Sequence, residues 1–198
     1  ATILLGYFIG AMPFGFLAGK LRGVDLRQYG SGKLGATNVL RTLGTRTAIV
    51  VFATDILKGV GAAYLGFYLM RGIPGALAGG LAAMLGHNWP LYLRFRGGRG
   101  VLVFLGSFFV LDWRIALAGG LFGLLVIALS RYASLGSLLG VALGVVLGLL
   151  LWVLSGVGEP FIFALAGGSL VLFQHRDNIY RLLSGTERKL GSKAEKRG

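Results

Sequence analysis

Cysteine is absent from the 198-residue sequence, which excludes disulfides and thiol chemistry. Charge is also scarce: only 14% of the residues are charged, whereas 55% are hydrophobic and the mean hydropathy is +0.76. This composition is typical of an integral membrane protein, and the length accommodates about six to eight spans of roughly 20 residues each. We therefore expect one transmembrane domain over residues 1–198, in which 189–198 forms a flexible basic tail.

Acidic side chains are especially rare, with 7 Asp and Glu against 20 Lys and Arg, and the formal net charge is +13. Such a surplus can indicate nucleic-acid binding, but the sequence contains no basic module interleaved with aromatic residues. Basic residues also gather on the cytoplasmic side of membrane proteins, where they attract anionic lipids and anionic substrates. We therefore expect membrane lipids as partners and no nucleic acid, and we infer no obligate protein partner.

Seven candidate spans are marked by uncharged runs, of which only the second is broken, by Asp55 and Lys58: 1–19, 47–70, 73–93, 100–111, 115–130, 132–158 and 160–174. The first has no basic n-region and no small-residue cleavage site, so we interpret it as a retained span rather than a signal peptide. The fourth is short, because a dozen helical residues rise only about 18 Å against a hydrocarbon core of about 30 Å. We expect it to borrow residues from its flanks.

The distribution of Lys and Arg determines whether the fourth and fifth runs are separate spans. With seven spans and the N-terminus outside, 17 of the 20 basic residues lie inside, two outside and one within a span. Merging the two runs would leave nine inside and nine outside. The positive-inside rule favours the first arrangement. The predicted fold is an all-α integral membrane protein with seven transmembrane helices, a cytoplasmic C-terminus and three polar motif segments on the cytoplasmic side.

Glycine accounts for 35 residues, and many of them recur every fourth residue within the spans. The repeats are Gly6/Gly10, Gly15/Gly19, Gly75/Gly79 and the run Gly136, Gly140, Gly144 and Gly148. Small residues at this spacing let membrane helices approach one another closely. We predict that these glycines serve helix packing, so that glycines outside the spans need another explanation.

The first polar segment, residues 30–41, reads GSGKLGATNVLR. It matches the GxGxxG pattern and nearly matches a Walker A motif, but a membrane bundle offers neither the strand nor the βαβ unit that those motifs require. Closely spaced glycines do let backbone N–H groups converge on an anion. The segment adds side-chain donors at Ser31, Thr37, Asn38 and Arg41. The alternative is a flexible glycine hinge between two spans.

The second polar segment, residues 86–100, reads GHNWPLYLRFRGGRG. Three arginines around a Gly-Gly turn, followed by the start of a helix, could form a second anion cradle. For Arg94 and Arg96 alone, ordinary positive-inside flanking is the simpler explanation, whereas we favour a functional role for GGRG. His87 lies near a span end, where it is either a hydrogen-bonding interface residue or a catalyst.

The third polar segment, residues 174–187, reads QHRDNIYRLLSGTE. His175, Asn178 and Arg181 would share a broad face of a helix, and a histidine that titrates near neutral pH is a candidate for proton handling or phosphate contact. A histidine in a juxtamembrane tail can equally have no function.

Within the second span, Asp55 and Lys58 form either a mutually neutralising pair or a unit in which Lys58 contacts a substrate phosphate.

Taken together, the motifs resemble those of the bacterial membrane-bound acyl-phosphate:glycerol-3-phosphate acyltransferases, which make lysophosphatidic acid. The resemblance rests on GSGKLGATN with Arg41, on TDILKG around Asp55 and Lys58, on GHNWPLYLRFRGGRGV and on HRDNIYRLLSGTE. It implies a seven-span bundle in the cytoplasmic (inner) membrane with a cytoplasmic active site. It also implies transfer of an acyl group from acyl phosphate to the 1-hydroxyl of glycerol 3-phosphate, without a cofactor, metal or nucleotide.

The resemblance also implies roles for individual residues. The catalytic residues would be Ser31, Arg41, His175 and Asn178. The substrate-binding residues would be Gly30, Gly32, Gly35, Thr37, Asn38, Lys58, His87, Gly97, Gly98, Arg99 and Gly100. Glu187 would support the fold. The sequence departs from the family pattern at Lys33, where Asn is usual, at Arg96 and Arg99, where Lys is usual, and at Leu102 and Val103, where Ala and Thr are usual.

The chemistry expected of such an enzyme agrees with what the sequence lacks. Neither histidine begins the HxxxxD pair of the other large glycerolipid acyltransferase group, because residues 92 and 180 are tyrosines. An acyl phosphate is a mixed anhydride with a good leaving group, so we predict direct transfer without an acyl-enzyme. The alternatives are a small transporter of a phosphorylated anionic solute, for which we find no internal repeat, and a lipid-binding scaffold, which would tolerate loss of His175 and Arg41.

Overall fold

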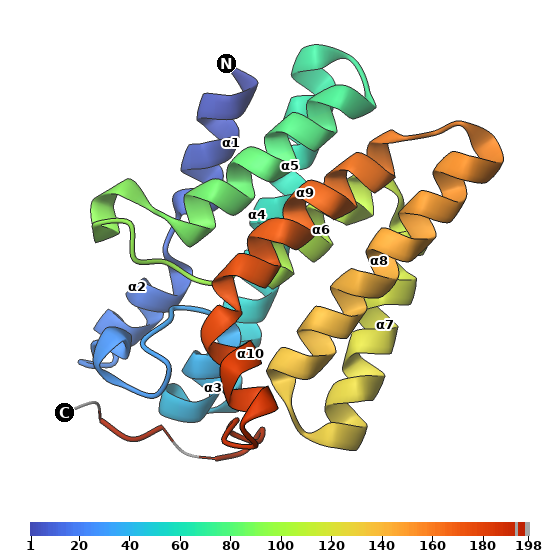
Figure 1. Cartoon of the computed structure of the whole chain (residues 1–198). Coiled ribbons are helices and arrows are strands. Elements are labelled where there is room, and N and C mark those ends of the chain that lie inside the picture. The colour runs from blue at the N-terminus through green and yellow to red at the C-terminus, as the bar shows by residue number, and fades with distance from the viewer. Residues whose placement is uncertain (193, 197–198) are drawn as a thin grey trace.

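The computed structural model describes residues 1–192 and 194–196, and within them it contains helices but no β-strand (Figure 1). The α-helices are α1 (Thr2–Ala11), α2 (Phe14–Leu21), α3 (Ala36–Leu43), α4 (Thr45–Met70), α5 (Ile73–Asn88), α6 (Val101–Leu111), α7 (Trp113–Ser130), α8 (Ala133–Ser155), α9 (Glu159–Gln174) and α10 (Arg176–Leu183). Two short 3-10 turns, η1 (Leu26–Gln28) and η2 (Leu91–Leu93), lie in the loops. The prediction of an all-helical fold is confirmed for these residues.

The long helices form two groups. Helices α1, α4, α5 and α6 pack against one another, and α9 lies along α5 and α6. Helices α7 and α8 form an antiparallel pair at the other side of the molecule, which contacts the first group through α6 and α9 (Figure 1). The short helices α3 and α10 lie at the same end of the bundle (Figure 1).

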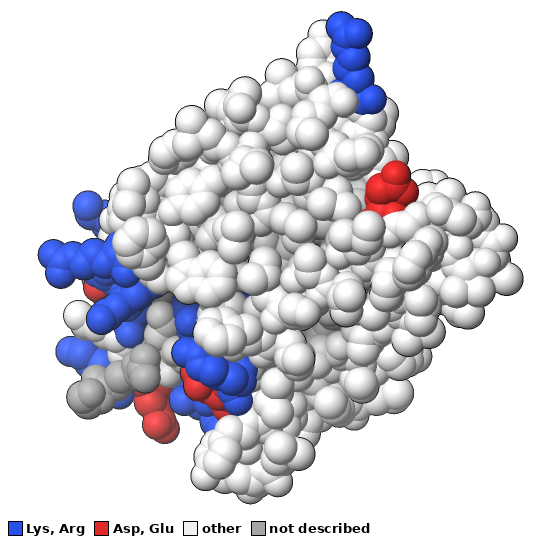
Figure 2. Space-filling model, turned by 45° about the horizontal axis from the view of Figure 1, so that its top comes forward, with Lys and Arg blue, Asp and Glu red and all other residues white. Residues whose placement is uncertain are grey.

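Four segments of the described chain are long and apolar enough to cross a membrane. They are Thr2–Leu21, which comprises α1 and α2, and the helices α4, α7 and α8. Helices α6 and α9 are apolar but shorter. Lys and Arg side chains gather at one end of the molecule, and the surface beyond them is almost free of charge (Figure 2).

The first predicted span is divided into two helices at Pro13. Proline lacks the N–H that a helix interior requires, and it also disfavours helical geometry at the preceding residue. Met12 accordingly has non-helical backbone angles, φ −56° and ψ 116°, and its carbonyl oxygen accepts only the N–H of Phe14 from the backbone, at 3.2 Å, in place of the i+4 bond of a continuous helix. The Nζ atom of Lys58 in α4 donates to that oxygen at 3.1 Å, so the lysine satisfies a group that the helix break exposes.

Two other predicted boundaries need correction. The third span was expected to continue to residue 93, but α5 ends at Asn88 because Pro90 prevents its continuation. The fourth was expected to borrow residues from its flanks, but α6 has only 11 residues. Gly100 precedes α6 with φ 80°, and Asp112 caps the next helix by accepting the N–H of Arg114 at 2.9 Å. Helix α6 is therefore bounded by a left-handed glycine at its start and by the N-cap of α7 at its end.

Several of the repeated glycines allow close approach of helices, as predicted. A Cβ atom on Gly10 would overlap the carbonyl group of Ala83 in α5, and one on Gly140 would lie 2.6 Å from the carbonyl oxygen of Gly119 in α7. Gly144 differs, because a Cβ atom there would meet only the ring edge of Phe108, at 3.2 Å. This glycine leaves space between side chains rather than bringing two backbones together.

Two hydrophobic clusters hold the bundle and its loops. The larger draws buried residues from α4 to α9, and contains three phenylalanine rings, Phe104, Phe108 and Phe163, with centroids 5.3–5.4 Å apart. The smaller consists of Leu26, Leu34, Val39, Ala48, Val51 and Leu93. Since this second cluster joins all of the loops that precede α4 and α6, it fixes the first two polar segments relative to each other.

Substitution of Gly10 by alanine should destabilise the protein, because the added methyl group overlaps backbone that cannot move away. Overpacking of this kind typically costs about 1–3 kcal/mol. The matched control is Gly61→Ala in α4, where a Cβ atom meets nothing within 4 Å. We expect a lower Tm in detergent for Gly10→Ala and an unchanged or slightly higher Tm for Gly61→Ala. Equal Tm values for both variants would contradict the close contact between α1 and α5.

Candidate active site

The three polar segments meet around a cavity of about 220 Å³ at the basic end of the bundle. Its polar end is lined by residues from all three: Ser31, Lys33, Thr37, Asn38, Arg41, Arg99, His175, Asn178 and Glu187. Its apolar end extends between α6, α7 and α8, where Leu102, Leu105, Phe108, Ala116, Gly120 and Gly144 are among the lining residues. A single cavity therefore joins a cationic site to a hydrophobic one.

Two helix N-termini face the polar end. Helix α3 begins after Gly35 and α6 begins after Gly100, and both glycines line the cavity. The first N–H groups of a helix have no partner within it, and the helix dipole places partial positive charge there. These two ends and the nearby arginines together favour a bound anion.

Arg41 and Arg99 supply full positive charge at the polar end. Burial, together with the nearby charge of Arg181, lowers the pKa of Arg99 to about 10, yet the guanidinium stays protonated at neutral pH. Burial also lowers the pKa of Arg41. Among the described residues, the buried Nε atoms of both arginines have no hydrogen-bond partner. Two cationic donors in one cavity are suited to a phosphate.

Asn38 organises the glycine-rich segment. Its Nδ2 donates to the carbonyl oxygens of Tyr29 at 3.1 Å and Lys33 at 2.9 Å, and its Oδ1 accepts the N–H of Ser31 at 3.1 Å. Gly30 has φ 54°, and a Cβ atom there would overlap Oδ1 of Asn38. The amide of Asn38 is thus used by the loop, which makes it a positioning residue.

The second segment turns tightly against α5. Gly97 and Gly98 donate their N–H groups to the carbonyl oxygens of Asn88 at 3.1 Å and His87 at 3.0 Å. A Cβ atom on Gly98 would overlap the His87 ring, so only glycine allows this approach. The turn delivers Arg99 and the start of α6 to the cavity.

Lys58 lies outside the main cavity. Its Nζ atom is 2.8 Å from Oδ1 of Asp55, and both side chains are buried. Together with the Met12 contact described above, this geometry favours the neutralising pair over a phosphate contact. Nδ1 of His87 is 3.7 Å from the same carboxylate, so His87 belongs to this buried group as well as to the cavity wall.

His175 is buried between α9 and α10, and it lines the polar end. Its Nδ1 is 2.8 Å from the carbonyl oxygen of Val171, which can only accept, so Nδ1 carries the proton. Burial lowers the pKa of His175 to about 4, and the charge of Arg99 contributes to the shift. At neutral pH the ring is therefore uncharged and its Nε2 is a hydrogen-bond acceptor.

Glu187 connects the third segment to α8. Its carboxylate accepts from Ser134 at 2.8 Å, from Asn178 at 2.7 Å and from Arg181 at 2.7 Å. These hydrogen bonds lower the pKa of Glu187 against the effect of its burial, so it is ionised at neutral pH. They leave the buried Oδ1 of Asn178 without a partner among the described residues. Ser134 was not predicted as part of the site, because its role depends on a contact between α8 and the segment after α10, which are far apart in the sequence.

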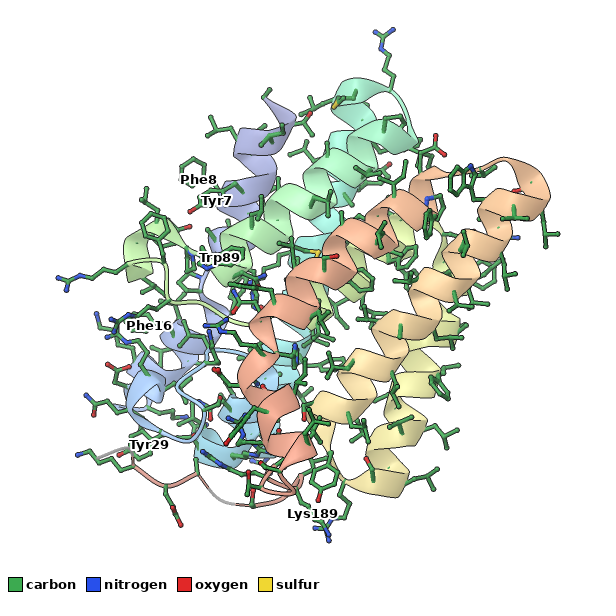
Figure 3. The ribbon with its side chains drawn as sticks, viewed as in Figure 1. Tyr7, Phe8, Phe16, Tyr29, Trp89 and Lys189 are labelled. Atoms are coloured by element: carbon green, nitrogen blue, oxygen red, sulfur yellow. The ribbon has the colours of Figure 1, made fainter. Side chains whose placement is uncertain are left out.

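The chain after α10 returns across the first polar segment. Gly30 donates its N–H to the carbonyl oxygen of Glu195 at 2.9 Å, and Arg41 donates to that of Arg188 at 2.9 Å. An open hollow of about 1000 Å³ lies beside these contacts and is bordered by Ser31, Arg99 and Arg181. Tyr29 and Lys189 lie at this end of the molecule (Figure 3). The flexibility expected of 189–198 stays a prediction, and residues 193, 197 and 198 lie outside the described residues.

Comparison with known proteins decides which family these features represent. Residues 1–185 match the family described as "Glycerol-3-phosphate acyltransferase". The chain belongs to the glycerol-3-phosphate acyltransferase family. It is therefore an acyltransferase, and the resemblance drawn from the motifs is confirmed. Membership favours the enzyme over the transporter and the scaffold.

Individual glycerol-3-phosphate acyltransferases align along nearly the whole chain. That of Thermoanaerobacter sp. (strain X514) is 46% identical over 195 residues, which cover 98% of this chain and 96% of the relative. One from Dehalococcoides mccartyi is 42% identical, with the same coverage. The crystal structure of PlsY (YgiH), an integral membrane glycerol 3-phosphate acyltransferase, in its glycerol 3-phosphate form has a TM-score of 0.87 at 37% identity, covering 96% of this chain and 94% of that one. Its lysophosphatidic acid form has a TM-score of 0.84 at 36% identity. This chain is accordingly a multi-pass membrane protein.

Most of the predicted acyltransferase site residues line the main cavity: Ser31, Gly35, Thr37, Asn38, Arg41, His87, Arg99, Gly100, His175 and Asn178. Gly30 borders the open hollow, and Lys58, Gly97 and Gly98 border a small separate void. Gly32 borders none of the cavities found in the described part of the chain. In that same part, no group of three or more His, Asp or Glu residues could hold a metal ion.

The pH dependence of stability should report the neutral state of His175. Its pKa is about 4 in the folded acyltransferase against an ordinary 6.5, so below pH 6.5 the unfolded chain takes up the proton first. The stabilisation is present above pH 6.5 and is lost as pH falls towards 4. The free energy of unfolding, and with it Tm, should therefore fall more steeply between pH 6.5 and pH 4.5 in the parent than in His175→Gln. The slopes of the two free-energy curves should differ by no more than ~1.4 kcal/mol per pH unit. Parallel curves would contradict a buried neutral imidazole.

Proposed function

We propose that this enzyme transfers a fatty acyl group from acyl phosphate to the 1-hydroxyl of glycerol 3-phosphate and releases lysophosphatidic acid. The observation that carries the proposal is the continuity of the cavity, because it joins a site for anions to an apolar space that fits a hydrocarbon chain. Solved relatives in glycerol 3-phosphate and lysophosphatidic acid forms support the acceptor and the product. This reaction would be the first acylation of phospholipid synthesis.

The polar end offers enough positive charge for two phosphates. In this proposal, Arg41, Ser31 and the N-terminus of α3 hold the phosphate of the donor. Arg99 and the N-terminus of α6 hold that of glycerol 3-phosphate. Lys33 is the third cationic side chain that lines the cavity, and it donates to Oε1 of Gln174 at 3.3 Å. Burial and the neighbouring charges of Arg99 and Arg176 lower the pKa of Lys33, which indicates a surplus of positive charge that bound phosphates would relieve.

The chemical step needs no acyl-enzyme. The hydroxyl oxygen of glycerol 3-phosphate attacks the carbonyl carbon of the acyl phosphate, a carbon–oxygen ester bond forms, and the bond from that carbon to the phosphate oxygen breaks. Arg41 and the N–H groups of the loop stabilise the charge that develops on the departing phosphate. The cavity contributes chiefly by holding the two reactants in line.

The hydroxyl proton leaves with the phosphate. His175 accepts a hydrogen bond from the hydroxyl through Nε2, which orients the nucleophile, and Asn178 supports the same group through Oδ1. With a pKa of about 4, His175 is a weaker base than a phosphate dianion, whose conjugate acid has a pKa of about 6. The proton therefore ends on the released inorganic phosphate, and His175 returns unchanged.

We further propose that the chain crosses the cytoplasmic membrane seven times, with the N-terminus outside. Helices α1 and α2 would together make the first crossing, and α4 to α9 the other six. The active site would then open on the cytoplasmic side, where the basic residues gather (Figure 2). The enzyme would act as a single domain, without a cofactor or an obligate protein partner.

The absence of native cysteine allows a direct test of this topology. Ser155→Cys lies at the end of α8 and Ser192→Cys lies in the tail, and both positions are exposed. In intact cells made permeable only at the outer membrane, a membrane-impermeant maleimide should label Ser155→Cys but not Ser192→Cys. Lysis should make both reactive. Labelling of Ser192→Cys before lysis would contradict the proposed orientation.

The donor is tested with purified enzyme, radiolabelled glycerol 3-phosphate and either palmitoyl phosphate or palmitoyl-coenzyme A. We expect labelled lysophosphatidic acid from the acyl phosphate alone. Arg41→Ala should lower kcat by about a hundredfold or more, because it removes a charged donor at the departing phosphate. The matched control is Arg46→Ala, an exposed arginine outside the cavity, which should retain activity. Product from the coenzyme A ester alone would contradict the donor, and a trapped acyl group on Ser31 would contradict direct transfer.

A further inference from the structure

The apolar end of the cavity is closed on one side of the bundle and open on another. Near α6 and α7, Leu102, Leu105 and Ile127 are partly exposed and Leu124 is 55% exposed. Farther from the polar end, Phe108 and Ala116 are 1% and 2% exposed. A hydrocarbon chain could therefore enter from the surrounding apolar phase near the polar end, but its tip would meet a wall of buried side chains.

The glycines along this cavity fall into two classes. Gly119 and Gly140 meet each other's carbonyl oxygens, with a Cβ atom at either position only 2.6–2.8 Å away, so they hold α7 against α8. Gly120 and Gly144 do not: added Cβ atoms would meet only side chains, at 3.3 Å from Leu105 and 3.2 Å from Phe108 respectively. Since close packing of helices does not require these two glycines, their effect is to leave room in the cavity.

The length of the apolar end can be estimated from the helices that line it. From Gly100 to Phe108 along α6 the rise is about 12 Å, and from Ile127 to Ile115 along α7 it is about 18 Å. A straight hydrocarbon chain advances roughly 1.25 Å per carbon–carbon bond, from a bond length near 1.5 Å and a tetrahedral angle. The cavity thus accommodates about 10 to 14 such bonds.

We propose that the closed end of the cavity, formed by Phe108, Ala116 and Gly144, sets the longest fatty acyl chain that the enzyme transfers efficiently. The inference rests on the acyl transfer proposed above. It assigns selectivity for acyl-chain length to residues remote from the reacting atoms. The acyl carbonyl lies at the polar end, the chain runs between α6, α7 and α8, and its terminal methyl group contacts the closed end. A longer chain must bend or displace the buried phenylalanine.

The depth of each position gives the proposal a graded test. Ala116→Leu fills the closed end. Gly120→Leu fills the cavity one helical turn closer to the polar end, about 6 Å or roughly five carbons earlier. The control is Ala142→Leu, which adds the same bulk to the exposed face of α8. All four enzymes are assayed with saturated acyl phosphates, and in parallel acyl-coenzyme A esters, from eight to eighteen carbons.

Both cavity variants should retain activity on short chains and lose about tenfold or more on sixteen carbons relative to ten. The longest accepted chain should be shorter in Gly120→Leu than in Ala116→Leu, by about five carbons, and unchanged in Ala142→Leu. The proposal would be overturned if a cavity variant lost the same activity at every chain length. It would also be overturned if the longest accepted chain did not shorten as the substituted residue lies closer to the polar end. If the parent is active only with the coenzyme A esters, the proposed donor is wrong. The chain-length proposal is then tested by comparing the longest accepted coenzyme A esters of the four enzymes.

Discussion

Buried positive charge at one end of the cavity is the constraint on which the arrangement of the other residues depends. Arg41 and Arg99 keep their charge although both are largely withdrawn from water. An unpaired buried charge is costly, and removal of a partner from such a group costs several kcal/mol. Glu187 and the contact of Arg41 with the returning chain limit this cost, yet the buried Nε of each arginine has no hydrogen-bond partner among the described residues.

The glycine-rich backbone makes that concentration of charge possible. Two helices begin at the cavity because the loops before them turn sharply, and those turns depend on glycine at positions where a side chain would collide with Asn38 or His87. The same residue type has a different function in the bundle, where it brings α1 to α5 and α7 to α8. Glycine therefore serves both the anion site and the helix packing, and only the surroundings of each glycine distinguish the two roles.

The sequence predicted those features that depend on local chemistry. Glycine spacing, the gathering of polar donors and the positions of the longest apolar helices can all be recognised without tertiary contacts. Helix boundaries were less predictable: Pro13 divides the first span, and α6 is short because it starts after a left-handed Gly100 and ends where Asp112 begins α7 as its N-cap. The contact of Lys58 with the carbonyl of Met12 joins a helix to the break between two others, and that of Ser134 with Glu187 joins a helix to the segment after α10. Neither pairing leaves a signal in the sequence. The apolar half of the cavity was missed for the same reason, since its walls come from three helices with ordinary compositions.

The shortness of α6 has a consequence for how two very different substrates meet. A helix of 11 residues rises about 16 Å, roughly half of the hydrocarbon thickness. In the proposed seven-span arrangement, α6 begins well below the level of the lipid headgroups, so the anion site lies at the bottom of a polar depression rather than at the membrane surface. The water-soluble acceptor would reach the site through this depression, and the acyl chain of the lipid donor would stay within the hydrocarbon layer. The reaction would thus take place where water and hydrocarbon adjoin. Glycerol 3-phosphate would not have to enter the hydrocarbon, and the acyl chain would not have to enter water.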